Sequence, residues 1–208
     1  MQNNRIVHIV DDDEAVRQSL AFLLSSAGLA VRVYDSATAF LASLSGVKAG
    51  CLITDMRMPD MTGLELLHEL KARTCGLPAI VITGHGDVPL AVEAMKAGAV
   101  DFIEKPFDEE AIVNAVQSAL ERGAEGEGRD APAIAGKLAT LSERERQVLE
   151  GLVAGHPNKT IAYDLGISPR TVEVYRANLM AKMGAKSLSE LIRMAIVAKV
   201  APTHRAAK

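Results

Sequence analysis

Aromatic residues and long apolar runs are both scarce in this chain of 208 residues. Trp is absent, and Tyr and Phe together account for 3 % of the sequence. No apolar run approaches the ~20 residues that a membrane helix needs. The N-terminus also lacks a basic segment followed by an apolar stretch and a cleavage site. We therefore expect no membrane segment and no export signal, and a cytoplasmic location.

Cysteine is nearly absent as well. Cys51 and Cys75 are too far apart in the sequence for a metal knuckle or a CxxC redox pair. Cys51 opens an apolar run that is typical of a buried strand. The pattern predicts two reduced, structural thiols, which fits a reducing cytosol.

Positive charge is scarce in the first part of the chain. Residues 1–121 carry nine Lys and Arg against seventeen Asp and Glu, a net charge of −8, whereas residues 139–208 carry eleven against six, a net charge of +5. This asymmetry indicates nucleic acid as the partner of the basic part. Since domains typically hold about 100 to 150 residues, we expect two of them.

Short apolar runs alternate with stretches of helical period throughout residues 1–121. The predicted strands are Arg5 to Val10, Ala30 to Tyr34, Cys51 to Thr54, Ala79 to Thr83 and Val100 to Glu104. The predicted helices are Glu14 to Ser26, Ala37 to Leu44, Leu64 to Arg73, Val88 to Ala97 and Glu109 to Arg122. Alternation of this kind predicts an α/β doubly wound, five-stranded parallel sheet.

The rest of the chain contains no predicted strand. Residues 122–138 are rich in Gly, Ala and Glu without an apolar stripe, which predicts a linker into which the fifth helix can continue. Residues 139–208 predict a small all-α domain of four helices. The helices are Glu143 to Ala154, Lys159 to Leu165, Pro169 to Met183 and Leu188 to Val200, with Ser142, Asn158, Ser168 and Ser187 as N-caps.

Polar residues follow four of the predicted strands. Asp11 and Asp12 follow the first strand, Asp55 the third, Thr83 ends the fourth and Lys105 follows the fifth. Parallel strands bring these residues to one edge, where converging carboxylates need a cation, and all-oxygen ligands suit Mg²⁺. With Lys105 as a second cation, the set fits phosphoryl transfer to Asp55.

Two helices joined by a tight LGIS turn lie in the basic part, with the spacing of a helix-turn-helix. The second helix of such a motif enters the major groove of DNA. The residues expected to point outward from it are Arg170, Thr171, Glu173, Val174, Arg176 and Ala177.

The acidic part resembles a response-regulator receiver domain through four motifs in order. These are IVDDDEAVR, LITDMRMPDMTGLELL, IVITGHG and DFIEKPF. The resemblance implies that Asp55 accepts a phosphoryl group from a histidine kinase. It also implies that Asp12, Asp55 and the Arg57 carbonyl bind Mg²⁺, with Asp11 acting through water, that Thr83 and Lys105 hold phosphoryl oxygens, that Phe102 is the aromatic switch, and that Arg57 and His85 tune the lifetime of the phosphoryl group.

The basic part resembles the LuxR-type DNA-binding domain through the run NKTIAYDLGISPRTVEVYRANLMAKM, and the domain order is that of the FixJ-like branch of response regulators. The resemblance implies a transcription activator that dimerises when phosphorylated and binds promoter DNA and RNA polymerase. Its implied kinase is the oxygen-sensing haem protein FixL, in the control of nitrogen fixation. Residues near bases would be Glu173, Val174 and Ala177, and those near the DNA backbone Lys159, Thr160, Ser168, Thr171 and Arg176.

Two other interpretations stay open. Asp11 and Asp13 have the DxD spacing of an aspartate-nucleophile phosphatase, in which Asp11 would be phosphorylated. In the other interpretation, the helical end binds protein in place of DNA. Otherwise we expect no enzymatic activity beyond phosphorylation and dephosphorylation of the receiver itself.

Overall fold

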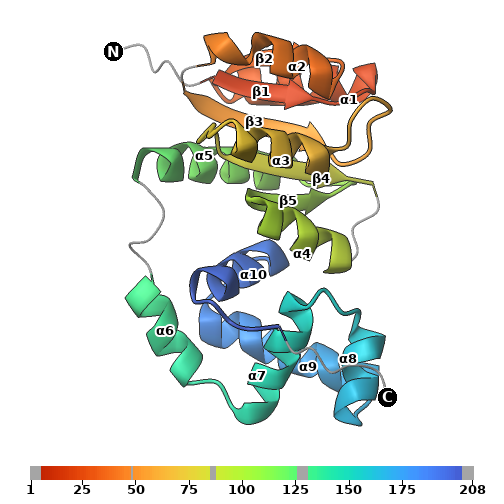
Figure 1. Cartoon of the computed structure of the whole chain (residues 1–208), viewed down its shortest axis with the longest axis vertical. Coiled ribbons are helices and arrows are strands. Elements are labelled where there is room, and N and C mark those ends of the chain that lie inside the picture. The colour runs from red at the N-terminus through yellow and green to blue at the C-terminus, as the bar shows by residue number, and fades with distance from the viewer. Residues whose placement is uncertain (1–5, 48, 85–87, 126–130, 203–208) are drawn as a thin grey trace. The chain divides into compact units, whose positions relative to one another are not determined.

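The computed structural model describes residues 6–47, 49–84, 88–125 and 131–202, and the chain divides into two compact units (Figure 1). The first unit is built on a β-sheet and the second is helical. In chain order, the elements up to residue 125 are β1 Ile6–Val10, α1 Glu14–Ser26, β2 Ala30–Tyr34, α2 Ala37–Ser43, a single 3-10 turn η1 Leu44–Gly46, β3 Gly50–Asp55, α3 Gly63–Ala72, β4 Ala79–Thr83, α4 Val88–Ala97, β5 Ala99–Glu104 and α5 Glu109–Glu125.

The five strands form one parallel sheet in the order β2-β1-β3-β4-β5. Strand pairing fixes the register at the carboxyl ends of the strands, because Val10 lies opposite Thr54 and Thr83 lies opposite Glu104. The residues that follow these strands therefore meet at one edge of the sheet, where open α/β sheets bind ligands. The predicted five-stranded parallel sheet is confirmed.

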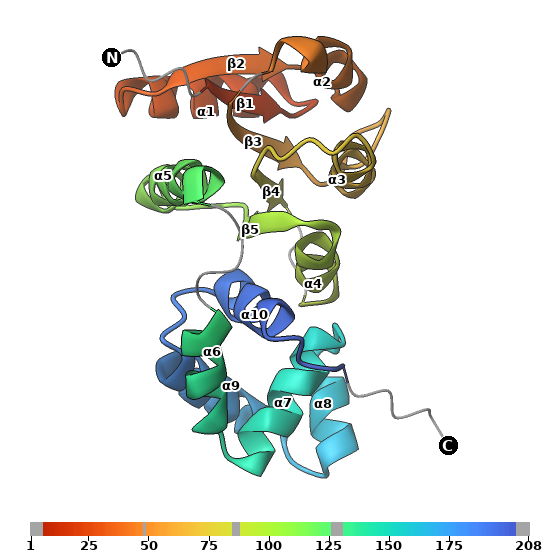
Figure 2. The same ribbon diagram turned by 60° about the vertical axis from the view of Figure 1, so that its left-hand side comes forward.

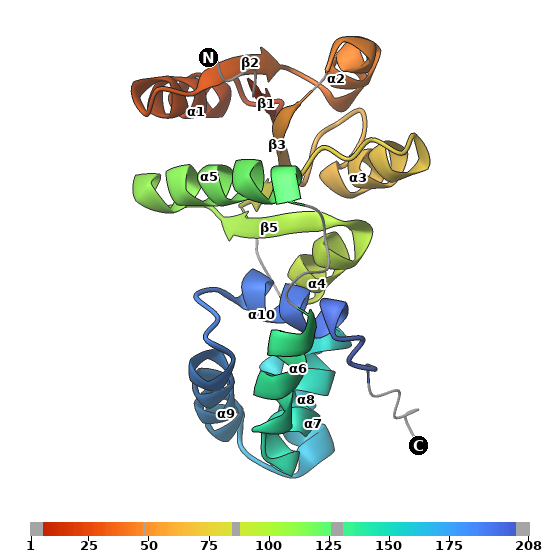
Figure 3. The same ribbon diagram turned by 90° about the vertical axis from the view of Figure 1, so that its left-hand side faces the viewer.

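Helices cover the sheet on both faces. Figures 2 and 3 show α1 and α5 on one side of the sheet, with α2 and α3 on the other. The side chains that pack between the sheet and the first pair of helices are almost fully buried: Val7, Ile9, Cys51, Ile53, Ile80 and Ile82 from the strands, Leu20 and Leu24 from α1, and Ile112, Val116, Ala119 and Leu120 from α5. Full burial of one such aliphatic side chain contributes ~1.5–3 kcal/mol, so this core holds the strand ends firmly.

The helical unit contains α6 Ala131–Ala139, α7 Glu143–Val153, α8 Asn158–Leu165, α9 Pro169–Met183 and α10 Leu188–Val197. Local signals set the ends of the two central helices. Ser168 accepts a hydrogen bond from the Thr171 amide at the start of α9, and Gly166 and Gly184 end α8 and α9 at φ 65° and 64°. Glycine reaches such left-handed angles without a steric penalty. No helix in the described part of the chain is long and apolar enough to cross a bilayer.

The structure corrects the interpretation of residues 122–138. α5 continues to Glu125, as the prediction allowed, but residues 131–139 form α6 where a linker without an apolar stripe was predicted. Ile134 and Leu138 are 3 % and 8 % exposed, and they lie four residues apart on one helical face. Two apolar residues at this spacing are enough for one side of a short helix to pack.

Asn158 was also assigned a role that it does not have. The N-cap of α8 is Pro157, which has no side-chain capping bond, and Asn158 is the first residue of the helix. Its Oδ1 atom accepts a hydrogen bond from Arg176 Nη1 at 3.0 Å. Asn158 therefore joins α8 to α9 in place of capping α8.

Candidate functional site

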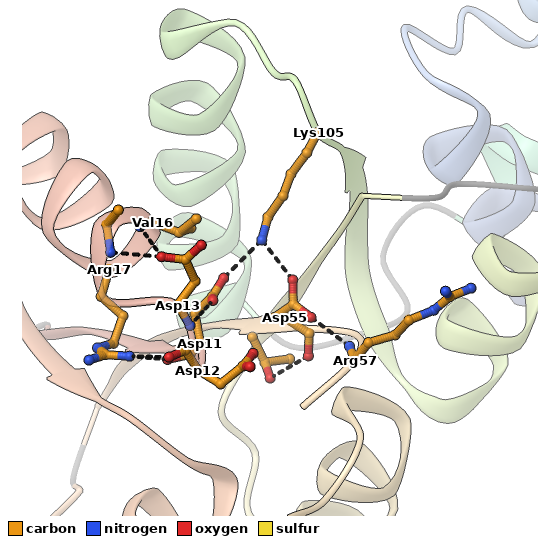
Figure 4. A network of polar contacts seen from close by, with 10 residues as sticks. Asp11, Asp12, Asp13, Val16, Arg17, Asp55, Arg57 and Lys105 are labelled. Atoms are coloured by element: carbon orange, nitrogen blue, oxygen red, sulfur yellow. Dashed lines mark hydrogen bonds and ion pairs between the residues drawn. The ribbon is translucent and has the colours of Figure 1, made fainter. Parts of the chain in front are cut away.

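The carboxylates of Asp11 and Asp55 converge on one lysine (Figure 4). Lys105 Nζ lies 2.9 Å from Asp11 Oδ2 and 2.7 Å from Asp55 Oδ1. Both carboxylates are buried, with Asp11 2 % and Asp55 8 % exposed. The lysine arrives from the end of β5, where its main-chain amide donates to the Thr83 carbonyl at 2.7 Å. Three of the residues predicted at the sheet edge are thus in direct contact.

The acidic turn after β1 is held by several hydrogen bonds. Asp13 is the N-cap of α1 and accepts from the Ala15 amide at 2.8 Å, while its own amide donates to Asp11 Oδ1 at 2.9 Å. The carboxylate of Asp12 is exposed at the tip of this turn. Arg17 donates from Nη1 to the carbonyls of both Asp11 and Asp12. The prediction missed Arg17, because its partners are main-chain atoms.

The loop after β3 supports the other oxygen of Asp55. The Arg57 amide donates to Asp55 Oδ2 at 2.6 Å, while the Arg57 side chain points away from that carboxylate (Figure 4). The Met56 amide donates to the Ile82 carbonyl at 2.8 Å, and the Gly63 amide donates to the Met56 carbonyl at 3.0 Å. This loop therefore links the end of β3 to both β4 and the start of α3.

The remaining residues predicted for this site lie on β4 and β5. Thr83 is 1 % exposed at the end of β4, and Phe102 is half-buried on β5 opposite Val81. Phe102 therefore lies two positions along the ladder from Thr83. His85 lies outside the described residues.

The electrostatics of the site follow from burial and pairing. Burial raises the pKa of Asp11 above its ordinary value, and the hydrogen bond from Lys105 opposes this without overcoming it. Burial alone lowers the pKa of Lys105, but its hydrogen bonds to Asp55 and Asp11 outweigh that effect and raise the pKa above the ordinary value. Two carboxylates held by one ammonium still carry an excess negative charge, which an additional cation could neutralise.

The donor set fits a hard divalent cation. Asp11, Asp12, Asp55 and the Arg57 carbonyl offer only oxygen atoms, and Mg²⁺ usually takes one or two carboxylates and keeps several waters. Within the described residues, no three Asp, Glu, His or Cys side chains form a ready metal cluster. Such a cluster is not required for Mg²⁺, so the residues present are compatible with it.

The predicted DNA-contacting residues lie on α8 and α9, and most are exposed. Lys159 and Thr160 are exposed near the start of α8, and Ser168 is exposed before α9. On α9, Arg170, Glu173, Val174 and Ala177 are exposed as predicted. An exposed cation near a helix start and an exposed helix face are the features that a helix-turn-helix uses on DNA.

Two α9 residues are less exposed than predicted. Thr171 is half-buried, and its hydroxyl lies 2.8 Å from the Ser168 hydroxyl. Arg176 is half-buried as well; burial lowers the pKa of its guanidinium, and Nη1 is bonded to Asn158. These two side chains do not point outward freely, because they take part in positioning α9.

Comparisons with known proteins assign both parts of the chain. Residues 7–117 match the response regulator receiver domain, and residues 139–195 match the bacterial regulatory proteins of the luxR family. This chain belongs to the response regulators. The predicted FixJ-like combination of a receiver and a LuxR-type domain is confirmed, and the chain is a phosphorylation-activated transcription regulator that binds DNA.

Similar proteins match this response regulator over nearly its whole length. The transcriptional regulatory protein FixJ of Azorhizobium caulinodans is 63 % identical over 96 % of this chain and 96 % of that protein. FixJ of Rhizobium meliloti is 61 % identical over 95 % and 98 % of the respective chains. A crystal structure of full-length FixJ from B. japonicum is 52 % identical, covers 94 % of this chain and 97 % of its own, and gives a TM-score of 0.57.

Proposed function

We propose that Asp55 is the residue that accepts the phosphoryl group from a histidine kinase. The supporting observation is the 2.7 Å contact between Lys105 Nζ and Asp55 Oδ1 at the carboxyl edge of the sheet. In the transfer, an oxygen of Asp55 attacks phosphorus while the bond between phosphorus and the kinase imidazole breaks. The imidazole leaves with the electron pair, and an acyl phosphate forms on Asp55.

The other residues of the site neutralise charge around this reaction. Lys105 is placed to pair with the phosphoryl oxygens once they replace a carboxylate oxygen as its partner, and Thr83 would donate its hydroxyl to them. Mg²⁺, held by Asp11, Asp12, Asp55 and the carbonyl of Arg57, would supply further charge neutralisation when bound. Phe102 would then repack as the aromatic switch, which biases an element with two arrangements.

The helical unit would deliver the output. A phosphorylated homodimer binds promoter DNA through α9, with Glu173, Val174 and Ala177 near bases. Lys159, Thr160, Ser168, Thr171 and Arg176 would hold the DNA backbone, and Arg170 is a further DNA-binding residue on α9. RNA polymerase is the further partner of an activator. The likeness to FixJ proteins leads us to propose the haem oxygen sensor FixL as kinase, nitrogen-fixation genes as targets and the cytoplasm as location.

The phosphatase interpretation fits the geometry less well. Asp11 accepts from the Asp13 amide and from Lys105, but Asp55 likewise accepts from the Arg57 amide and from Lys105, so this bonding does not separate the two carboxylates as nucleophiles. Asp13, the second residue of the DxD pair, caps α1. To act as a general acid, Asp13 would first have to leave this N-cap position.

The experiment is phosphodonor labelling followed by mapping of the modified residue. Wild-type protein incubated with acetyl phosphate and Mg²⁺ should be labelled on Asp55, and Asp55→Asn should abolish labelling while the exposed Asp35→Asn variant keeps it. Incubation with the phosphodonor should also increase retention of promoter DNA by the wild-type protein, but not by Asp55→Asn. Label on Asp11, or turnover of small phosphate esters, would support the phosphatase. DNA retention that does not change with labelling would support a protein-binding output.

A further inference from the structure

A single guanidinium nitrogen holds two consecutive carbonyls of the acidic turn. Arg17 Nη1 donates to the Asp11 carbonyl at 2.7 Å and to the Asp12 carbonyl at 2.9 Å (Figure 4). Arg17 is half-buried on the first turn of α1, and its own amide donates to the Asp13 carbonyl at 3.0 Å. The side chain thus reaches back over the turn from the helix that the turn precedes.

Among the described residues, the other hydrogen bonds of this turn involve Asp11 and Asp13. The Asp11 amide donates to the Tyr34 carbonyl at 3.3 Å, the Asp11 carboxylate is held by Lys105, and the Asp13 carboxylate is held by α1. The Asp12 carboxylate is exposed, so its direction depends on the backbone that carries it. Arg17 is the side chain that fixes the Asp12 carbonyl, and therefore the orientation of the Asp12 peptide.

We propose that Arg17 is a positioning residue that orients Asp12 toward the divalent cation of the phosphorylation site. The inference rests on the proposed function, because it takes Asp12 as a cation ligand. Residues that orient the ligands of a metal typically change its affinity about 10- to 100-fold when they are replaced. Arg17 does not touch the cation in this role and acts only through the two carbonyls.

Charge and position make opposite predictions for Arg17. A positive guanidinium beside an acidic turn repels an incoming cation, so removal of its charge alone would tighten cation binding. Loss of the two hydrogen bonds would release the Asp12 peptide and weaken cation binding. The direction of the change in affinity therefore separates a positioning role from a through-space effect.

The test measures the affinity of the full unphosphorylated chain for Mn²⁺, a probe for Mg²⁺, with electron paramagnetic resonance as the readout of binding. Arg17→Gln should weaken Mn²⁺ binding about tenfold, at the lower end of the range for ligand-orienting residues. Arg17→Lys keeps the charge but cannot present the guanidinium, and it should weaken binding in the same direction. Arg32→Gln, an exposed arginine on β2, is the matched control and should bind Mn²⁺ within about twofold of wild type, since exposed charges are screened by salt.

Unchanged or tighter binding in Arg17→Gln would overturn the proposal. If Arg17→Gln fails to fold in thermal melts, Arg17→Lys decides: unchanged Mn²⁺ affinity overturns the proposal and weakened affinity supports it. Labelling of Asp55 at saturating Mg²⁺ should persist in both variants, because the ligands are still present. Absence of Mn²⁺ binding by wild type would overturn the proposed function together with this inference, whereas normal wild-type binding with unaffected variants would overturn this inference alone.

Discussion

Lys105 Nζ lies 2.7 Å from Asp55 Oδ1 although the two residues are fifty positions apart in the chain. The contact exists because β3 and β5 both end at the same edge of the sheet, on either side of β4. The same nitrogen also bonds to Asp11, so one cation holds two buried carboxylates. The three side chains of the proposed phosphorylation site are therefore already in contact in the unphosphorylated chain.

Replacing this cation should change the protonation of Asp11. In Lys105→Met, burial and the Asp55 charge remain while the opposing lysine is gone, so the pKa of Asp11 should rise further above its ordinary value. An acid with a raised pKa in the folded state binds its proton more tightly there than when unfolded. Protonated Asp11 therefore stabilises the fold at low pH, and this contribution to the unfolding free energy is lost as pH rises from about 3.8 through the folded pKa. In Lys105→Met the higher folded pKa should extend this pH range upward.

Carbon-13 NMR titration of the Asp carboxyls measures this directly. The exposed Lys96→Met variant is the control and should leave the Asp11 titration as in wild type. An Asp11 pKa that does not move in Lys105→Met would contradict the role assigned to the lysine.

Gly63 should tolerate no side chain. A Cβ atom at Gly63 would lie 2.4 Å from the Asp55 carbonyl oxygen and 3.2 Å from Met56 Cα, and both of these are main-chain atoms that cannot rotate away. Gly63→Ala should therefore cost at least ~1–3 kcal/mol of unfolding free energy, as overpacking does, and displace the Asp55 backbone. Slower labelling of Asp55 at equal folded fraction is the second expected effect.

Gly76 is the matched control for this prediction. A Cβ atom there meets nothing within 4 Å. Gly76→Ala should therefore change the unfolding free energy by no more than ~0.5 kcal/mol, the usual range for surface substitutions. Urea unfolding of wild type, Gly63→Ala and Gly76→Ala tests both predictions. Equal stability of the two variants would show that the start of α3 shifts to accommodate the added Cβ atom.

His8 should make stability depend on pH below neutrality. It is 1 % exposed on β1, Nδ1 lies 3.1 Å from the Tyr34 hydroxyl, and no described residue bonds to Nε2. Burial, helped by the nearby charge of Arg32, lowers the pKa of His8 below 6.5. The unfolded chain then binds the proton more tightly, so this contribution to stability is present above about 6.5 and is lost as pH falls toward the folded pKa.

Urea unfolding of wild type, His8→Leu and His68→Leu between pH 5 and 7 tests this assignment. The His8→Leu curve should lose part of the decline in stability on acidification. His68 is exposed on α3, so His68→Leu should keep the wild-type slope. An unchanged slope in His8→Leu would assign the acid sensitivity to other groups.

Elements with strong local signals could be predicted from the sequence almost to the residue. β2, β4 and α9 have the predicted bounds, because each is closed by turn or capping residues that act over a few positions. The edge-sharing of Asp11, Asp55 and Lys105 could also be predicted, since it follows from parallel strand topology alone. These predictions needed no knowledge of particular side-chain contacts.

Contacts between side chains and distant main-chain atoms could not be predicted. Arg17 bonds to two main-chain carbonyls, and Gly63 lies close to the Asp55 carbonyl. Because every residue has a main-chain carbonyl, the sequence does not indicate which carbonyls make such contacts. α6 was missed for another reason. Its two buried apolar residues are diluted by Ala and Gly, so helical periodicity is weak until the surface that they pack against is known.

α6 should stabilise α9, the helix proposed to enter the DNA groove. Lys137 Nζ donates to the Met183 carbonyl at 2.8 Å, at the C-terminal end of α9, where cations are favourable. Leu138, one residue further, is 8 % exposed. Leu138→Ala should lower the stability of the helical unit by ~2–5 kcal/mol, as for other large-to-small core changes, and increase amide hydrogen exchange in peptides from residues 169–183. The exposed Ala135→Ser variant controls for changes within α6 itself and should leave exchange in those peptides as in wild type. If residues 131–139 had no packing role, neither variant would change hydrogen exchange in residues 169–183. Increased exchange in Leu138→Ala alone would identify α6 as part of the DNA-binding fold.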